Sequence, residues 1–259
     1  YGVRCGLENV IFTNNDSAYE TALSLYKSGT KLNAIIDIRD NSSSEIVNKV
    51  KSLGIQIYWN HTIVNTKGYK RINKVTVMKL NDKGNDVIGK KIELNCDCLA
   101  ISGGWTPMVH LFTQSGGKLK FDNKDNIFVP DKTNLNQLSI GSAKGDFELD
   151  DVLKNSIKDT KKFLQIENSN FDKIDVKCSK EKEKKNIWLL PSDKPLSKTK
   201  PFLDYQNDST AKDIKLALRE GFKSIEHVKR YTTTGMGTDQ GKLGNMHALG
   251  IISETAGAK

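Results

Sequence analysis

Two polar stretches near the C-terminal end determine how that part of the sequence folds: Lys200-Pro-Phe-Leu-Asp-Tyr-Gln-Asn-Asp-Ser-Thr-Ala-Lys-Asp-Ile214 and Lys229-Arg-Tyr-Thr-Thr-Thr-Gly-Met-Gly-Thr-Asp-Gln-Gly-Lys242. Asn207 or Asp208 can cap a helix over residues 210–221, and Ser224 can cap another over residues 225–231, because these side chains accept from unpaired amides at a helix start. Apolar side chains recur on one face of both helices. The stretches therefore predict a compact all-helical (all-α) domain over residues 201–259.

The order of these motifs resembles the bacterioferritin-associated-ferredoxin-like iron–sulfur domain. In that family, four cysteines hold a two-iron two-sulfur cluster, and the matching positions here are Asp204, Gln206, Asp239 and Gly244. Iron–sulfur clusters need thiolate ligands, and no cysteine follows Cys178. We therefore expect no iron–sulfur cluster in this domain.

The cysteine-less version of the domain is closely similar to the alpha subunit of heterotetrameric sarcosine oxidases, and we extend the resemblance over nearly all of residues 1–259. It implies partners, the beta, gamma and delta subunits. In that family, FAD in the beta subunit oxidises the amine, FMN lies at the alpha–beta boundary, oxygen becomes hydrogen peroxide, and the alpha subunit holds NAD. The implied reaction is oxidative demethylation of sarcosine to glycine, with the one-carbon unit passed to tetrahydrofolate or released as formaldehyde. This sequence lacks the family's C-terminal folate-binding domain.

Two alternatives to this function remain open. One is the reductase-like subunit of another amine or imino-acid dehydrogenase complex, acting on proline or hydroxyproline. The other is a non-catalytic scaffold subunit. The loop at Thr233, Thr234 and Gly235 likewise has two interpretations: its hydroxyls and amides form a phosphate or cofactor cradle, or it is a threonine-rich helix end that packs against the subunit.

Residues 9–40 are predicted to form a strand, a helix and a strand, which is one βαβ half of a dinucleotide-binding fold. The usual glycine-rich turn is replaced by Thr13-Asn-Asn-Asp-Ser-Ala18, so the close glycine approach to a pyrophosphate is missing. Asn15 and Asp16, at the helix start, remain candidates for binding a phosphate. Asp37 or Asp40 is placed to reach a ribose hydroxyl, or else both are exposed loop carboxylates.

The next elements follow the order of the inserted nucleotide domain of flavoprotein reductases with two dinucleotide domains. They are a helix over 44–53, a strand over 54–59, and a hairpin of strands 72–80 and 87–94. Ala100-Ile-Ser-Gly-Gly-Trp-Thr-Pro107 resembles the return crossing of that family. Residues 137–145, followed by a helix over 150–164, resemble its last strand and turn, with Ser142 where the family has Asp.

The glycine turns in these last segments are the remaining nucleotide-binding candidates. We expect Gly103, Gly104, Gly141 and Ser142 to line the carboxyl ends of parallel strands, where ligands collect in this architecture. The alternative is that these glycines form plain strand-to-loop turns. The unit that would carry the main glycine fingerprint is expected upstream of Tyr1.

The sequence as a whole predicts an α/β fold followed by the small helical domain. Residues 1–165 form a reductase-like nucleotide-binding region, with an inserted domain over about 1–95 and the return part of the first domain over about 96–165. Residues 166–200 form a polar linker in which Ile187-Trp-Leu-Leu190 docks on a neighbouring surface. The chain is expected to end without a terminal element of its own.

Composition narrows the remaining functional classes. The net charge of +9 is spread over many lysines with only five arginines, which disfavours a nucleic-acid interface. No secretory signal or apolar run of about 18 residues is present, so we expect a cytoplasmic protein without membrane association. The cysteine pair Cys96 and Cys98 is expected to be two free thiols. The four histidines do not cluster, so no catalytic residue and no metal site is assigned.

Overall fold

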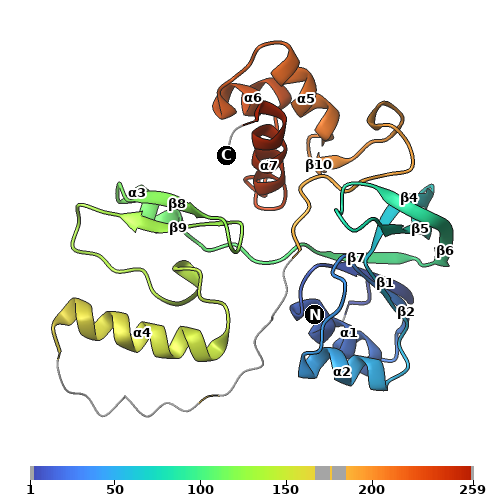
Figure 1. The fold of residues 1–259 in the computed structure, drawn as a ribbon, viewed down its shortest axis with the longest axis horizontal. Coiled ribbons are helices and arrows are strands. Elements are labelled where there is room, and N and C mark those ends of the chain that lie inside the picture. The colour runs from blue at the N-terminus through green and yellow to red at the C-terminus, as the bar shows by residue number, and fades with distance from the viewer. Residues whose placement is uncertain (1–2, 167–175, 177–184, 258–259) are drawn as a thin grey trace.

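The computed structural model describes residues 3–166, 176 and 185–257 (Figure 1). Residues 167–175 and 177–184 of the polar linker predicted over 166–200 lie outside the described residues. The fold is mixed α/β, with a parallel sheet in its N-terminal part and a group of helices at its C-terminal end. None of the helices in the described ranges is long and apolar enough to cross a membrane.

A four-stranded parallel sheet forms the centre of the N-terminal part. Its order is β3 (Ile57–Trp59), β2 (Lys31–Asp37), β1 (Glu8–Thr13) and β7 (Cys98–Ser102). All neighbouring pairs run parallel, with Ile11 opposite Ile35 on one side and Ala100 on the other. The crossover helices are α1 (Ser17–Lys27) and α2 (Glu45–Ser52). The βαβ unit predicted over residues 9–40 is therefore present.

This sheet is the middle of three layers, and side-chain alternation along β1 shows why. Val10 and Phe12 point to one face, where they pack with buried residues of an antiparallel sheet. Ile11 points to the other face, into a second core formed with α1 and α2. Successive side chains of a strand face opposite ways, so a strand that is apolar at every position must be covered on both sides.

The antiparallel sheet consists of β4 (His61–Gly68), β5 (Ile72–Leu80) and β6 (Val87–Asn95). The hairpin of β5 and β6 matches the prediction, whereas β4 was not predicted because its second half is polar and exposed. β7 pairs with β1, so in the structure residues 98–102 belong to the same sheet as the first βαβ unit.

Residues 110–164 form α3 (His110–Gln114), the antiparallel pair β8 (Lys118–Asp122) and β9 (Ile127–Lys132), the short 3₁₀ helix η1 (Gly141–Ala143), and α4 (Leu149–Leu164). Figure 1 shows them to one side of the parallel sheet. The predicted helix over 150–164 is confirmed. The predicted last strand at 137–141 is wrong: no described strand pairs with it, and Gly141, at φ +60°, instead starts the 3₁₀ turn.

The C-terminal domain contains α5 (Ala211–Arg219), α6 (Ile225–Thr232) and α7 (Asn245–Ala256), preceded by the 3₁₀ turn η3 (Leu196–Lys198). It is not all-helical as predicted, because β10 (Phe202–Asp204) pairs with β11 (Ser209–Thr210). Thr210 is also the N-cap of α5, where a capping box with Asp213 holds the extended backbone that makes this pairing possible. The expectation that the chain ends without a terminal element is wrong as well, since α7 fills that position.

A segment of six residues, 185–190, contacts both parts of the molecule, and we call it the docking segment. Ile187 and Leu190 pack against the core between the two sheets. Trp188 and Leu189 pack against the core of the C-terminal helices. The indole of Trp188 also meets His247 of α7 edge to face, with ring centroids 6.1 Å apart. The prediction that residues 187–190 dock on a neighbouring surface is confirmed.

His247 predicts a pH dependence of this contact. Burial lowers the pKa of His247 below its ordinary value near 6.5. The unfolded chain therefore binds the proton more readily, so stability is fully present above pH 6.5 and falls as the pH drops below it. We expect wild type to lose more stability between pH 7.5 and pH 5.5 than a His247→Gln variant, measured by urea unfolding at each pH. Equal losses in the two proteins would contradict this assignment.

Candidate functional site

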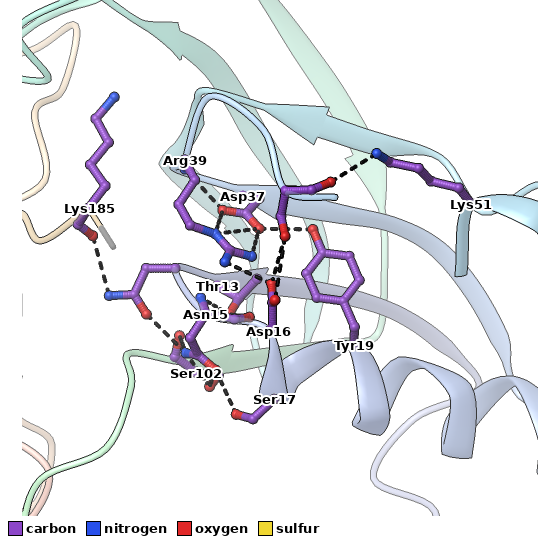
Figure 2. A network of polar contacts seen from close by, with 12 residues as sticks. Thr13, Asn15, Asp16, Ser17, Tyr19, Asp37, Arg39, Lys51, Ser102 and Lys185 are labelled. Atoms are coloured by element: carbon purple, nitrogen blue, oxygen red, sulfur yellow. Dashed lines mark hydrogen bonds and ion pairs between the residues drawn. The ribbon is translucent and has the colours of Figure 1, made fainter. Parts of the chain in front are cut away.

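The predicted nucleotide site lies where β1, β2 and β7 end and α1 begins. Asn15, at the turn between β1 and α1, is 6% exposed and donates from Nδ2 to the Ser102 carbonyl at 3.3 Å and hydroxyl at 3.0 Å. Its Oδ1 accepts from the Ser17 hydroxyl at 2.6 Å (Figure 2). Trp105 Nε1 donates to that hydroxyl at 3.0 Å. Asn15 therefore joins the ends of two parallel strands to the helix start.

A buried ion network holds the end of β2. Asp37 is 0% exposed and accepts hydrogen bonds on both carboxylate oxygens. Oδ1 accepts from the Arg39 amide at 2.9 Å and Nε at 3.0 Å, and Oδ2 accepts from Arg39 Nη2 at 2.7 Å and from the Tyr19 hydroxyl at 2.8 Å. Arg39 Nη1 also lies 2.8 Å from Asp16 Oδ1, at the start of α1.

The protonation states follow from this geometry. Burial and the neighbouring Asp37 carboxylate raise the pKa of Tyr19, which keeps its hydroxyl a donor. Burial alone would lower the pKa of Arg39, but hydrogen bonds and charge attraction with Asp37 and Asp16 raise it overall. The guanidinium is 1% exposed and remains a cation between two carboxylates.

The turn between β1 and α1 and the end of β2 do not fit a dinucleotide. A pyrophosphate needs close-approaching backbone amides at the helix N-terminus, and here the Asn15 side chain and the Asp16 carboxylate stand at that place. A ribose needs a carboxylate with free acceptor positions, and Asp37 is buried under Arg39 and Tyr19. The open alternative of an exposed loop carboxylate is wrong for Asp37 but holds for Asp40, whose side chain is 71% exposed.

The four glycine-turn positions that were also predicted to bind the nucleotide lie in two different places in the fold. Gly103 and Gly104 follow β7, and Gly103 faces the ring of His247 on α7. Gly104 has φ +102°, a conformation that favours glycine. Gly141 instead packs on Val152 of α4, and Ser142 beside it is exposed. The structure therefore brings Gly103 and Gly104 to the end of a parallel strand, as expected, but not Gly141.

Three of the four positions that match cluster ligands, Asp204, Gln206 and Asp239, hold a loop together through oxygen acceptors. Asp204 is 6% exposed and accepts from the amides of Gln206, Asn207 and Gly235 at 2.8, 3.1 and 2.8 Å. Burial opposes ionisation of Asp204, but these bonds and one from the Asn207 side chain lower its pKa below the ordinary value.

Gln206 and Asp239 act in the same way as Asp204. Gln206 Oε1 accepts from the Thr238 amide and from its hydroxyl, the latter at 2.8 Å. Asp239 accepts from the amides of Gly241 and Leu243 at 3.1 and 3.3 Å. Gly244 contributes by its lack of a side chain, since a Cβ there would lie 2.2 Å from the Leu203 carbonyl oxygen. Side-chain oxygens thus bind the loop amides where thiolates would hold a cluster.

The hydroxyls of the threonine loop turn inward. Thr234 is 2% exposed and its hydroxyl lies 2.8 Å from that of Thr232. The Thr233 hydroxyl donates to the Thr232 carbonyl at 2.7 Å, and the Gly235 amide donates to Asp204. These contacts favour the packing interpretation of Thr233, Thr234 and Gly235 over the phosphate cradle.

The cysteines and possible metal ligands are separate from both regions. Cys5 is exposed, Cys96 buried and Cys98 partly buried, all as free thiols. Burial raises the pKa of Cys96 and Cys98, which makes them poor nucleophiles. Within residues 3–166, 176 and 185–257, no group of three or more His, Cys, Asp and Glu side chains is placed to hold a metal ion.

Sequence reasoning missed Arg39 and the bonding role of Asp204. Arg39 lies two residues after Asp37 at the end of a buried strand, on the same side of the chain, so the spacing alone indicated a pair. Asp204 was recognised only as the replacement of a ligand. One of its partners, the Gly235 amide, lies 31 positions away, and no local pattern indicates that bond.

Comparisons with known proteins agree with the motifs quoted from the C-terminal part. Residues 198–259 match the family described as the sarcosine oxidase A3 domain. The chain is 32% identical over 271 residues to a sarcosine oxidase subunit alpha of Corynebacterium sp. (strain P-1), covering 99% of this chain and 27% of that protein. It is 31% identical over 261 residues to the same subunit of Rhizobium meliloti (strain 1021), covering 99% and 25%.

The fold also has a counterpart among solved structures. L-proline dehydrogenase from P. horikoshii superposes with a TM-score of 0.51 at 16% identity, over 98% of this chain and 46% of that chain. At this identity the likeness concerns the fold alone. The chain spans about a quarter of the length of the curated relatives it matches. The predicted resemblance to the alpha subunit of sarcosine oxidase is thereby confirmed along 99% of the chain, and a sarcosine oxidase A3 domain is present at residues 198–259.

Proposed function

We propose that this chain is a portion of the alpha subunit of a multi-subunit sarcosine oxidase. The complex oxidises sarcosine to glycine, forms hydrogen peroxide, and passes the one-carbon unit to tetrahydrofolate or releases formaldehyde. The observation that carries the proposal is the match to named alpha subunits along 99% of the chain. Beta, gamma and delta subunits are the partners in this proposal, and the complex is cytoplasmic.

We assign a framework role, and no catalytic step, to this portion of the subunit. The carboxylates that the sequence singled out, Asp16, Asp37 and Asp204, each accept hydrogen bonds or form ion pairs within the fold. A general base needs a carboxylate or imidazole that can reach substrate. Amine oxidation belongs, in this proposal, to FAD in the beta subunit, which supplies the redox chemistry when bound.

The loop end of the C-terminal domain is the surface that we assign to the beta subunit. Tyr205 and Leu243 are 66% and 72% exposed, and Phe202 and Met236 are exposed beside them. Contacts between Gln206 and Thr238, and between Gly244 and the Leu203 backbone, bring the two loops together. Aromatic residues and methionine are enriched in protein interfaces. FMN is placed at this alpha–beta boundary.

NAD in the whole subunit is placed away from the turn between β1 and α1. Asn15, Asp16 and Asp37 do not fit a dinucleotide, so the glycine turns at Gly103 and Gly104 are the preferred contacts. Gly141 and exposed Ser142 form a second candidate at the start of α4. Binding at either turn involves segments of the subunit outside this chain.

The substrate assignment is tested on the complex. We expect the full-length subunit to co-purify from its source with unlike subunits carrying flavin, and the complex to form hydrogen peroxide when sarcosine is added. Peroxide formation with and without sarcosine is measured by a coupled peroxidase assay, with proline and hydroxyproline as parallel substrates. Turnover of proline but not sarcosine would move the assignment to an imino-acid dehydrogenase. A fully active single subunit would reject the role in a complex.

The loop assignment is tested by Asp204→Asn. This change keeps the shape but removes a charged acceptor from three backbone amides, so we expect the free energy of unfolding to fall by about 1–3 kcal/mol. Loosening the loop is also expected to slow electron transfer between the two flavins, measured by stopped-flow spectroscopy. Asp208→Asn is the matched control, because Asp208 is exposed and at φ +53° tolerates Asn. Unchanged stability and transfer in Asp204→Asn would show that the loop does not depend on this carboxylate.

A further inference from the structure

The docking segment lies on the end of the parallel sheet where a nucleotide would enter. Asn14, in the turn after β1, donates from Nδ2 to the Lys185 carbonyl at 3.5 Å and to Asn186 Oδ1 at 3.3 Å (Figure 2 shows the contact with Lys185). Lys185 Nζ donates to Asn60 Oδ1 at 2.9 Å, at the end of β3, and lies 3.6 Å from Asp40 Oδ1. These contacts reach the carboxyl ends of β1, β2 and β3.

The same segment continues onto the antiparallel sheet and the C-terminal helices. A Cβ on Gly84, at the tip of the hairpin, would lie 3.3 Å from Ile187 Cδ1, so the glycine gives the segment room. A Cβ on Gly250 of α7 would lie 2.2–2.7 Å from three atoms of the Trp188 indole. Gly250 therefore lets the helix backbone contact the ring directly.

Beneath the docking segment, carboxylates of the protein itself stand where the charged groups of a nucleotide would bind. Asp16, at the start of α1, is paired with the Arg39 guanidinium, which also binds Asp37. A carboxylate at a helix N-terminus makes the same favourable interaction with the amide dipoles that a phosphate makes. Arginine bonds a carboxylate through a planar pair of donors, and here Asp37 takes that position.

We infer that the dinucleotide crevice at the carboxyl ends of β1, β2 and β3 is closed by the chain itself and serves as the attachment site of the C-terminal domain. The docking segment covers the crevice, Asp16 at the start of α1 is paired with Arg39, and Asp37 is held by Arg39 and Tyr19. This inference does not depend on whether the substrate is sarcosine. It assigns to the first βαβ unit a structural partner, the C-terminal domain, in place of a nucleotide.

The contact between Trp188 and Gly250 is tested by whether Gly250→Ala stabilises or destabilises α7. In an ordinary helix, Gly→Ala raises the equilibrium constant for helix formation about fivefold. The Trp188 ring occupies the space of a Cβ, so we expect Gly250→Ala to destabilise α7 in the otherwise wild-type protein. In a Trp188→Ala background, where that space is empty, we expect Gly250→Ala to stabilise α7 by about the same fivefold factor. The readout is hydrogen exchange of the α7 amides in the full-length subunit. A favourable Gly250→Ala in wild type would overturn the inference.

A milder variant keeps the test decisive should Trp188→Ala fail to fold. Asn14→Ala removes two hydrogen bonds from the covering segment and leaves both cores intact. We expect amides 185–187 to exchange about tenfold faster in this variant, with β5 unchanged. Equal exchange in the variant and in wild type would show that the segment is not held on the turn after β1.

The closure itself is tested with NAD⁺ and ADP-ribose as probes. Hydrogen exchange of the intact complex is measured with and without each compound. We expect residues 13–17 and 37–40 to exchange at the same rate in both conditions. Slower exchange there would mean that the crevice opens and binds nucleotide, and would overturn the inference. Protection confined to residues 103–104 or 141–142 would support it, and would separately support the proposed position of NAD.

Discussion

The N-terminal part of the molecule depends on the burial of one cation, Arg39. Its guanidinium lies between Asp37 at the end of β2 and Asp16 at the start of α1, and it is 1% exposed. Removing one partner of a buried ion pair typically costs about 3–5 kcal/mol, because the other charge is left without compensation. The strand end and the helix start are therefore held in one relative position. Tyr19, bonded to Asp37 and stacked near Trp59, extends this arrangement into the core.

The two regions that resemble cofactor sites share one feature: in each, an aspartate of the protein itself stands where a ligand would bind. In the first, a carboxylate stands at a helix N-terminus and pairs with Arg39. In the second, Asp204 accepts from three amides of a loop whose counterparts in the resembled family surround a cluster. Groups of converging amides are costly to bury without an acceptor. A fold that has lost a ligand must supply acceptors from its own side chains, and aspartate supplies them with least bulk.

The docking segment explains how two domains without a large common sheet stay together. Four consecutive residues divide between two cores: the outer two, Ile187 and Leu190, pack in one, and the inner two, Trp188 and Leu189, pack in the other. Full burial of a large apolar side chain stabilises by about 1.5–3 kcal/mol, and each of these four partly buried side chains contributes a part of that, so together they stabilise the attachment even though the segment is short. Glycines at 84 and 250 leave room for the side chains of Ile187 and Trp188.

The sequence by itself determined the elements that rest on local chemistry. The apolar runs at residues 9–13 and 32–38 predicted β1 and β2, the Asn81-Asp-Lys-Gly-Asn85 turn predicted the hairpin, and the spacing of polar motifs after Lys200 predicted α5, α6 and the loss of cluster ligands. The bonds of Asp37 with Tyr19 and of Asp204 with Gly235 were decided only by tertiary structure, because these partners lie 18 and 31 positions away. The failed strand at 137–141 has the same cause. An extended apolar run becomes a strand only when a neighbouring strand pairs with its backbone, and pairing is a property of the fold, whereas helices and tight turns satisfy their hydrogen bonds within a few residues.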